Sequence, residues 1–158
     1  MDLDPFSFLV TLLAVNGVFT INIIVLCVLL ACSALVSGAE VAMFGLSPTE
    51  IKELQDEKSA KSAILIKLLE RPKKLLATIL IANNAINIGI VLLFSIIGDT
   101  LFKNVNQVLF GLVSVRFLLE VVVATFLILM FGEILPKVYA NRNRMSFSHL
   151  MAFPLRVL

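Results

Sequence analysis

The chain has 158 residues, of which 59% are apolar and only 15% are charged, and its mean hydropathy is +1.03. Soluble domains carry roughly a quarter of their residues as charges, and a globule of this size could not bury so much apolar surface. The composition therefore excludes an ordinary soluble domain and indicates an integral membrane protein, while a formal net charge of only +2 gives no reason to expect a nucleic-acid partner.

The N-terminal region predicts an outer segment followed by a first membrane span. Met1–Pro5 contains two aspartates and neither Lys nor Arg, whereas a cleavable signal peptide starts with basic residues, so none is expected. The apolar run that follows is too long for one simple span, and Asn16-Gly17 interrupts it. We therefore expect an outer segment over residues 1–18 and a span over about residues 19–45.

Residues 47–74 predict helices at the membrane surface. The segment opens with Ser47 as an N-cap, Pro48 in the first helical position and Glu50 in an acidic first turn. Apolar residues then alternate with charges as far as Pro72, which is typical of one or two amphipathic helices lying along a membrane. A solvated helical hairpin packed on the span ends has the same pattern, so both arrangements stay open.

Two further apolar stretches predict spans over about residues 75–97 and 117–140. After them, residues 141–158 mix Phe, Leu and Met with Arg, which predicts a juxtamembrane amphipathic helix that Pro154 bends or ends. The predicted fold class is therefore an all-α membrane protein with three transmembrane helices plus amphipathic cytoplasmic and juxtamembrane helices.

Basic residues are concentrated on one side of the predicted spans. The loop between the second and third spans contains only Lys103, with Arg116 at its far end. The opposite side carries Lys52, Lys58, Lys61, Lys67, Arg71, Lys73 and Lys74 in the first loop and Lys137, Arg142, Arg144 and Arg156 after the third span. Because Lys and Arg favour cytoplasmic loops, this distribution predicts an outside N-terminus and a cytoplasmic C-terminus.

Each predicted span carries polar residues at a similar depth. Insertion scales put a central charge in a span at a cost of about 2.5–3.5 kcal/mol, so such residues need a partner or a function. Ser37, Asn83, Asn87 and Glu133 all lie about nine to thirteen residues from the cytoplasmic span ends, which corresponds to about 13–20 Å along a helix. One shared layer in three spans predicts a single common site.

The chemistry of this layer predicts a site for a hard cation. Asn83 and Asn87 are four residues apart and share a helix face, and Pro136 cannot donate a backbone hydrogen bond, so the Gly132 carbonyl loses its helical partner. A hydroxyl, two amides, a carboxylate and a free carbonyl are all oxygen ligands, which favour Mg²⁺ or Ca²⁺ over zinc or copper. Glu40 could supply a second carboxylate. Two carboxylates would neutralise a divalent ion, whereas Na⁺ would need only one.

Several structural interpretations compete with ion binding. Asn, Ser and Gly between membrane helices are often packing residues. Glu40 would then pair with Lys137 or a loop lysine, or Glu133 would pair with Lys137 at i,i+4. Arg116 and Glu120 have the same spacing near the outer boundary and are expected to pair there.

Three stretches together resemble one family of membrane domains. Ser37–Ala42 reads SGAEVA, Ala82–Asn87 reads ANNAIN and Phe131–Lys137 reads FGEILPK. In this order, and with the basic loop between the first two spans, they resemble the signature motifs of the CorC/cyclin-M (CNNM) transmembrane domain over nearly the whole chain. The acidic Asp-Pro opening is also similar to the gliding-motility-associated branch of that family.

The resemblance implies a homodimeric magnesium transporter of the bacterial plasma (inner) membrane. Members are usually described as Mg²⁺ exporters coupled to Na⁺ entry, with three spans, a juxtamembrane helix and a following cytosolic CBS pair. Carried over by motif, the metal-binding positions are Ser37, Asn83, Asn87, Gly132 through its carbonyl, and Glu133. Ala39 stands where many members have Ser, and Asn84 adds an amide that leaves the assignment between neighbouring amides open.

Energetics narrow the class of mechanism. Moving a divalent cation outward against about 100 mV costs about 4.6 kcal/mol, and no ATPase phosphate loop is present in the sequence. Export would therefore use secondary coupling to Na⁺ or H⁺, while a passive inward channel would use the same site.

A different functional class is a non-transporting dimeric anchor or magnesium-sensing scaffold for CBS or motility partners. An enzyme is not expected, because no nucleophile–base pair or Cys/His set is found.

Overall fold

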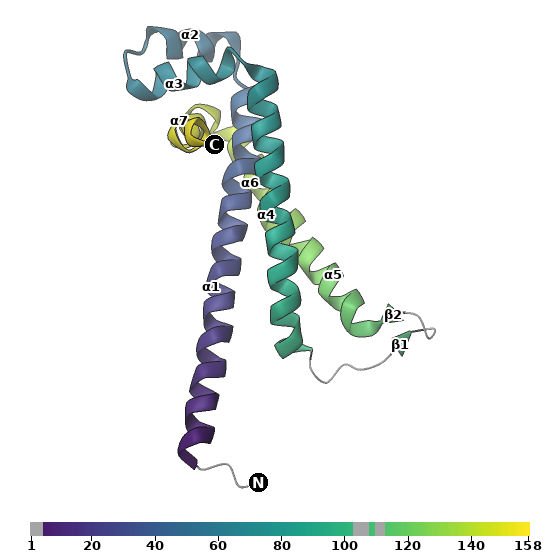
Figure 1. Ribbon diagram of the computed structural model, residues 1–158. Helices are drawn as coiled ribbons and strands as arrows, with labels where there is room; N and C mark the ends of the chain where they lie inside the picture. Colours follow the sequence, from purple (N-terminus) through teal and green to yellow (C-terminus); the bar gives the residue numbers. More distant parts are fainter. Residues whose placement is uncertain (1–4, 103–107, 110–112) are drawn as a thin grey trace.

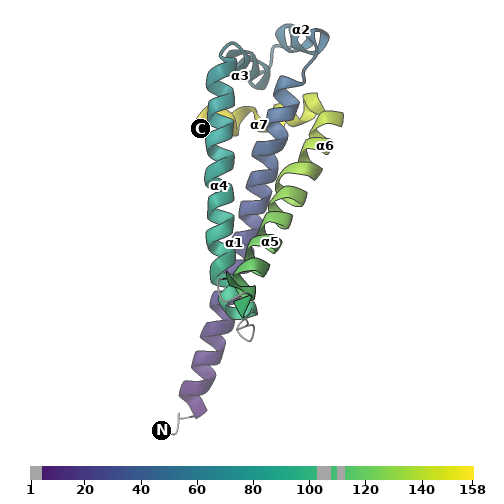
Figure 2. The ribbon, with the colours of Figure 1, turned by 90° about the vertical axis from the view of Figure 1, so that its right-hand side faces the viewer.

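Three long apolar helices form the body of the protein in the computed structural model, which describes residues 5–102, 108–109 and 113–158. The segments long and apolar enough to cross a membrane are Gly17–Phe44, Pro72–Leu101 and Val115–Arg142. Their helices lie side by side, with the first in contact with the other two (Figures 1 and 2). The predicted all-helical membrane fold with three spans is confirmed, whereas the orientation of the termini stays a prediction.

The elements follow one another in a simple up-down-up order (Figure 1). The first and second spans belong to α1 (Pro5–Phe44) and α4 (Pro72–Leu101), and the third is divided into α5 (Val115–Leu127), the π-helical η1 (Ile128–Ile134) and α6 (Leu135–Arg142). The remaining elements are α2 (Pro48–Asp56), α3 (Ala60–Leu69), α7 (Arg144–Val157) and the two-residue antiparallel strands β1 (Val108–Leu109) and β2 (Val113–Ser114). The acidic opening that resembles the motility branch lies mainly in residues 1–4, outside the described residues.

The first helix does not break at Asn16-Gly17, where the sequence suggested an interruption. Helix α1 runs without a break from Pro5 to Phe44. A glycine in a helix costs only about 1 kcal/mol relative to alanine, whereas an interrupted backbone in lipid would leave several polar groups without partners. The division into an outer segment over residues 1–18 and a span after it stays a prediction.

Of the two effects expected of Pro154, ending the helix is not observed. Pro154 lies inside α7, which continues to Val157. Only one turn follows it, so the helix loses little when the proline removes a backbone donor.

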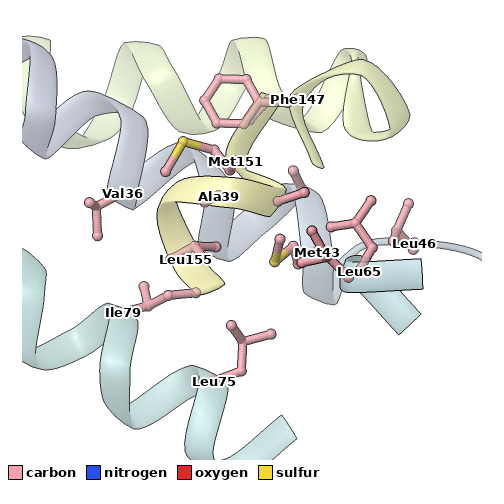
Figure 3. Close-up of a cluster of buried hydrophobic side chains, with 14 of the residues drawn as sticks. Val36, Ala39, Met43, Leu46, Leu65, Leu75, Ile79, Phe147, Met151 and Leu155 are labelled. Atoms are coloured by element: carbon pink, nitrogen blue, oxygen red, sulfur yellow. The ribbon is translucent and has the colours of Figure 1, made fainter. Parts of the chain in front are cut away.

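Helices α2, α3 and α7 pack at one end of the long helices, as Figure 1 shows. Buried side chains of α7, including Phe147, Met151 and Leu155, contact residues from α1, α3 and α4 in one apolar cluster (Figure 3). His149 of α7 also lies 3.4 Å from the Glu57 carboxylate at the end of α2. The hairpin therefore packs on the span ends and on α7, which is one of the two arrangements that the sequence left open.

The predicted start of α2 at Ser47 is confirmed in detail. The Ser47 backbone N–H donates to Glu50 Oε2 (2.7 Å), and the Glu50 N–H donates to Ser47 Oγ (3.3 Å), which together form a capping box. The Glu50 carboxylate accepts from the Ser47 N–H and also from the Ser47 hydroxyl (2.7 Å), and these two hydrogen bonds hold the pKa of Glu50 below its ordinary value of 4.5. Ionised Glu50 therefore stabilises the folded state fully above its ordinary pKa of 4.5. This stabilisation is lost as the pH falls through the lowered pKa that Glu50 has in the folded state.

Replacing Ser47 by Ala is expected to destabilise α2 by about 1 kcal/mol, because one donor of the first turn loses its partner. Amide hydrogen exchange should become about fivefold faster in α2 and stay unchanged in α4. Lys52→Ala, an exposed change in the same helix, is the control. Equal exchange in the two variants would contradict the capping role.

Candidate metal-ion site between the spans

A chain of polar side chains links the three spans. Ser33 Oγ of α1 lies within donor distance of two amide oxygens on α4, Asn83 Oδ1 at 3.1 Å and Asn87 Oδ1 at 2.9 Å. Asn87 Nδ2 in turn donates to Glu133 Oε1 of η1 at 3.3 Å. The structure therefore brings together three of the predicted site residues, Asn83, Asn87 and Glu133, and joins them through Ser33.

Depth along the helices explains why Ser33 takes this position. Ser33 lies about eleven residues from the end of α1, Asn83 about eleven from the start of α4 and Glu133 about nine from the end of α6. These separations correspond to about 14–17 Å of helix. Ser37 is one turn closer to the end of α1 and is therefore offset from the amides.

The Ser33 hydroxyl faces more oxygen acceptors than it can satisfy. A hydroxyl carries one hydrogen, so Ser33 can donate to only one of the two amide oxygens at a time. The Asn87 amide must turn its nitrogen towards Glu133, because a carboxylate only accepts hydrogen bonds, and this leaves the Asn87 oxygen facing Ser33. One amide oxygen and part of the carboxylate are therefore free to accept from another group.

Ser37 adds a further oxygen close by. Its side chain is fully buried, and its Oγ has no hydrogen-bond partner among the described residues. Ser37 and Ser33 are four residues apart and so share one face of α1. A buried hydroxyl without a partner costs free energy, and a bound cation would remove that cost.

Gly132 allows α1 to approach the third span closely. It is buried in η1, and a Cβ at this position would lie 2.8 Å from Ser33 Oγ. The π-helical segment ends just before Pro136, and Leu135 N–H donates to the Met130 carbonyl five residues earlier. A proline clashes with the carbonyl four residues before it, here that of Gly132, and a wider turn relieves the clash.

Gly132→Ala keeps the backbone carbonyl but is expected to displace Ser33 by a few tenths of an ångström or more. We therefore expect at least about a tenfold loss of divalent-cation affinity, because a 1 Å misplacement of a functional group can cost a hundredfold. Binding to the purified protein, measured by calorimetry, provides the test. Gly89→Ala is the matched control, because its Cβ would meet only Leu29 Cδ1 at an ordinary 3.7 Å. Equal affinities would show that this close approach is unimportant.

Glu40 and Lys137 form one of the predicted ion pairs. Lys137 Nζ lies 3.2 Å from Glu40 Oε2, so the alternative that paired Glu40 with Lys137 is confirmed. Glu133 has no basic partner among the described residues. Glu133 therefore provides the uncompensated negative charge of the cluster, while Asn84 is exposed on another face of α4.

The predicted pair near the outer boundary is also present. Arg116 Nε donates to Glu120 Oε1 at 2.8 Å, and the same guanidinium contacts Asp99 at the end of α4. A Cβ at Gly98 would lie 2.6 Å from Glu120 Cδ. This cluster therefore ties the end of α4 to the start of α5, well away from Ser33.

The donor set fits a hard cation and excludes a thiolate or imidazole site among the described residues. No group of three His, Cys, Asp or Glu side chains lies close enough there to hold a metal. Hydroxyl, amide and carboxylate oxygens are the ligands that Mg²⁺ prefers, usually with some water retained. The site would therefore use one carboxylate and several neutral oxygens.

Ser33 is the residue of this cluster that the sequence interpretation did not select. It occurs in the first span, four residues before Ser37, and that helical spacing was the available signal. The positions of the helix ends decide whether Ser33 or Ser37 lies level with the amides. These ends could not be predicted from the sequence to within one helical turn.

Comparison with known proteins gives a consistent family assignment. Residues 24–158 match the family model of the cyclin M transmembrane N-terminal domain. The chain is 34% identical over 140 residues to a UPF0053 protein of Haemophilus influenzae, covering 85% of this chain and 30% of that protein. It is 29% identical over 130 residues to the UPF0053 inner membrane protein YfjD of Escherichia coli K12, covering 80% and 28%.

A UPF0053 protein of Synechocystis, sll1254, is 28% identical over 127 residues, covering 80% of this chain and 34% of that protein. The chain thus spans about a third or less of the length of these relatives. The family resemblance predicted from the three motifs is confirmed. With a family match over most of its length and three helices long enough to cross a membrane, the chain belongs to the cyclin M (CNNM) transmembrane family and is a multi-pass membrane protein.

Proposed function

We propose that this domain transports Mg²⁺ across the bacterial inner membrane, as an exporter coupled to Na⁺ entry. Membership of the cyclin M family and similarity to the inner membrane protein YfjD support the location in the membrane and the class of protein. The observation that carries the proposal is the convergence of oxygens from Ser33, Asn83, Asn87 and Glu133 between the three spans, with the buried hydroxyl of Ser37, which has no hydrogen-bond partner among the described residues, one helical turn away. Polar groups inside a membrane are costly unless they are satisfied, and a bound cation would satisfy these oxygens.

The proposed binding step uses the charge of Glu133 and the oxygens around it. Mg²⁺ exchanges part of its hydration water for the two amide oxygens and the Ser33 and Ser37 hydroxyls, with the Gly132 carbonyl as a further ligand. Lys137 neutralises Glu40, so binding of a divalent ion leaves the cluster with one net positive charge. That excess charge favours release once the spans rearrange, because the site holds the ion without fully compensating it.

Outward movement of Mg²⁺ needs an energy source, and Na⁺ entry supplies one. Export of a divalent ion against about 100 mV costs about 4.6 kcal/mol, which the entry of two or more Na⁺ ions down their electrochemical gradient would offset. We further propose that the protein works as a homodimer and that a cytosolic CBS pair follows this domain in the full-length protein. The large apolar surface of the spans is available to lipid and to a second copy.

A non-transporting anchor or scaffold is the second candidate, and one observation favours it. The hydrogen bonds between Ser33, Asn87 and Glu133 tie the three spans together whether or not an ion binds. Polar contacts of this kind stabilise membrane helix bundles by about 0.6 kcal/mol each. An anchor would therefore need the same residues only for stability.

Flux measurements in sealed vesicles separate these functions. We expect Mg²⁺ uptake into inside-out vesicles that is at least about tenfold faster with an outward-directed Na⁺ gradient, a ratio that about 1.4 kcal/mol of coupling would give. Vesicles without protein and vesicles without Na⁺ are the controls. Mg²⁺ flux that ignores the Na⁺ gradient would reject the exchanger and favour a channel, and absence of flux under all gradients would favour the anchor.

A further inference from the structure

A cavity of about 640 Å³ lies between α3, the start of α4 and the end of α7, apart from the cluster between the spans. Four basic side chains line it: Lys67, Arg71, Lys74 and Arg156. All four are exposed, and none takes part in an ion pair within the part of the chain that the structure describes. No acidic residue is among the lining residues, so the cavity carries four positive charges without a counter-ion.

Apart from Thr78, the rest of the lining is apolar. Ile64, Leu68, Leu75, Phe153 and Leu155 contribute to it. Leu75 and Leu155 belong to the buried cluster (Figure 3), so this wall is a fixed part of the fold, whereas Phe153 keeps 48% of its surface exposed. A soluble anion would use the four charges and leave this apolar wall in contact with water.

The cavity lies where the second span begins. Helix α4 starts at Pro72, and Lys74, Leu75 and Thr78 lie on its first two turns. Helix α7 runs across the long helices at this level (Figure 2), as expected for a helix at a membrane interface. The cavity therefore faces the zone where lipid headgroups and the first part of the acyl chains meet.

The backbone adds to the positive potential. Arg71, the N-cap of α4, makes no side-chain capping hydrogen bond, and Pro72 has no N–H. The remaining free N–H groups of this turn and the helix dipole favour an anion nearby.

We propose that this cavity binds an anionic phospholipid. The lipid phosphate lies among Lys67, Arg71, Lys74 and Arg156, and the upper part of an acyl chain lies against Leu75, Leu155 and Phe153. Guanidinium and ammonium groups bind phosphates through charge-assisted hydrogen bonds, and basic pockets beside transmembrane helices are suited to anionic headgroups. The lipid comes from the cytoplasmic leaflet under the orientation that the Lys and Arg distribution predicts.

The proposal is tested by lipid retention on the purified protein. The protein is reconstituted in vesicles of phosphatidylcholine with an equal share of phosphatidylglycerol, extracted in mild detergent, and the bound lipid is identified by native mass spectrometry. The test variant combines Lys67→Gln, Arg71→Gln, Lys74→Gln and Arg156→Gln. The control combines Lys52→Gln, Lys58→Gln, Lys61→Gln and Lys73→Gln, four exposed lysines outside the cavity lining that give the same change of charge.

We expect the unmodified protein to retain phosphatidylglycerol in preference to phosphatidylcholine. One basic residue contributes about fivefold to the attraction of an anionic lipid. The cavity variant should therefore retain at least about tenfold less phosphatidylglycerol than the unmodified protein, while the control should lose less than about threefold. Circular dichroism and size-exclusion chromatography check that both variants fold.

Three results would overturn the proposal. Equal losses in the two variants would indicate general attraction to the membrane surface. Displacement of the lipid by millimolar inorganic phosphate would indicate a site for a free anion. Retention without preference between the two lipids, including retention of neither, would indicate that the cavity holds no anionic lipid and is filled by another part of the protein.

Discussion

Replacing Glu133 by Gln is expected to reduce Mg²⁺ transport at least about a hundredfold, because a bound Mg²⁺ would lose its one charged ligand and breaking such a charge pair costs about 3–5 kcal/mol. Glu133 is the carboxylate that lies beside the amide of Asn87 and has no basic partner among the described residues. The substituted amide keeps an oxygen that can accept the hydrogen bond from Asn87. The packing of the spans should therefore survive, while the charge that holds a cation is lost.

The measurement is Mg²⁺ flux in vesicles, with the amount of folded protein checked by size-exclusion chromatography. The double variant Glu40→Gln, Lys137→Gln is the control, because it removes a carboxylate of the first span together with its own partner and leaves the net charge unchanged. It should lower flux by less than about tenfold, since each group was compensated by the other. Unchanged flux in Glu133→Gln would remove Glu133 from the transport site.

Replacing Asn87 by Leu is expected to reduce transport by at least about tenfold, as the loss of one charge-assisted hydrogen bond and one ligand would predict. Asn87 is the residue that contacts both Ser33 and Glu133, so it links α1 with the third span. Leucine has a similar size, and membrane hydrogen bonds contribute only about 0.6 kcal/mol each. The fold should therefore be kept while the oxygen is lost.

Asn84→Leu is the matched control for this prediction. Asn84 is on the same helix and of the same type, but it is exposed on another face and makes no side-chain hydrogen bond within the described residues. Flux should be unchanged by it. A loss of thermal stability without a loss of flux in Asn87→Leu would contradict the ligand role of Asn87 and leave its amide only the role of holding the helices together.

The architecture followed largely from the sequence because lipid imposes strong constraints. Three long apolar stretches could only be helices, since each backbone group in a membrane needs a partner within its own segment. The same constraint explains the error at Asn16-Gly17, where weak local helix breakers were given too much weight. Helix continuity in α1 depends on the cost of an open backbone in lipid and not on local propensity alone.

The site was predicted in composition but not in full geometry. Asn83, Asn87 and Glu133 come together as their depths indicated, whereas the hydroxyl that reaches them is Ser33 and the predicted Ser37 stays without a partner. A difference of one turn follows from the exact helix ends, which sequence patterns place only within a few residues. The π-helical turn before Pro136 was also not predictable, because a proline can be accommodated in several ways.

The most direct measurement is the anomalous scattering of protein crystals grown with Mn²⁺, which favours the same oxygen ligands as Mg²⁺. We expect one strong peak between α1, α4 and η1, within about 2.5 Å of oxygens from at least Asn87, Glu133 and one of the serines, and we expect it to disappear when Mg²⁺ is added in excess. A saturating Mn²⁺ concentration that leaves this position empty while these side chains keep their contacts would contradict it.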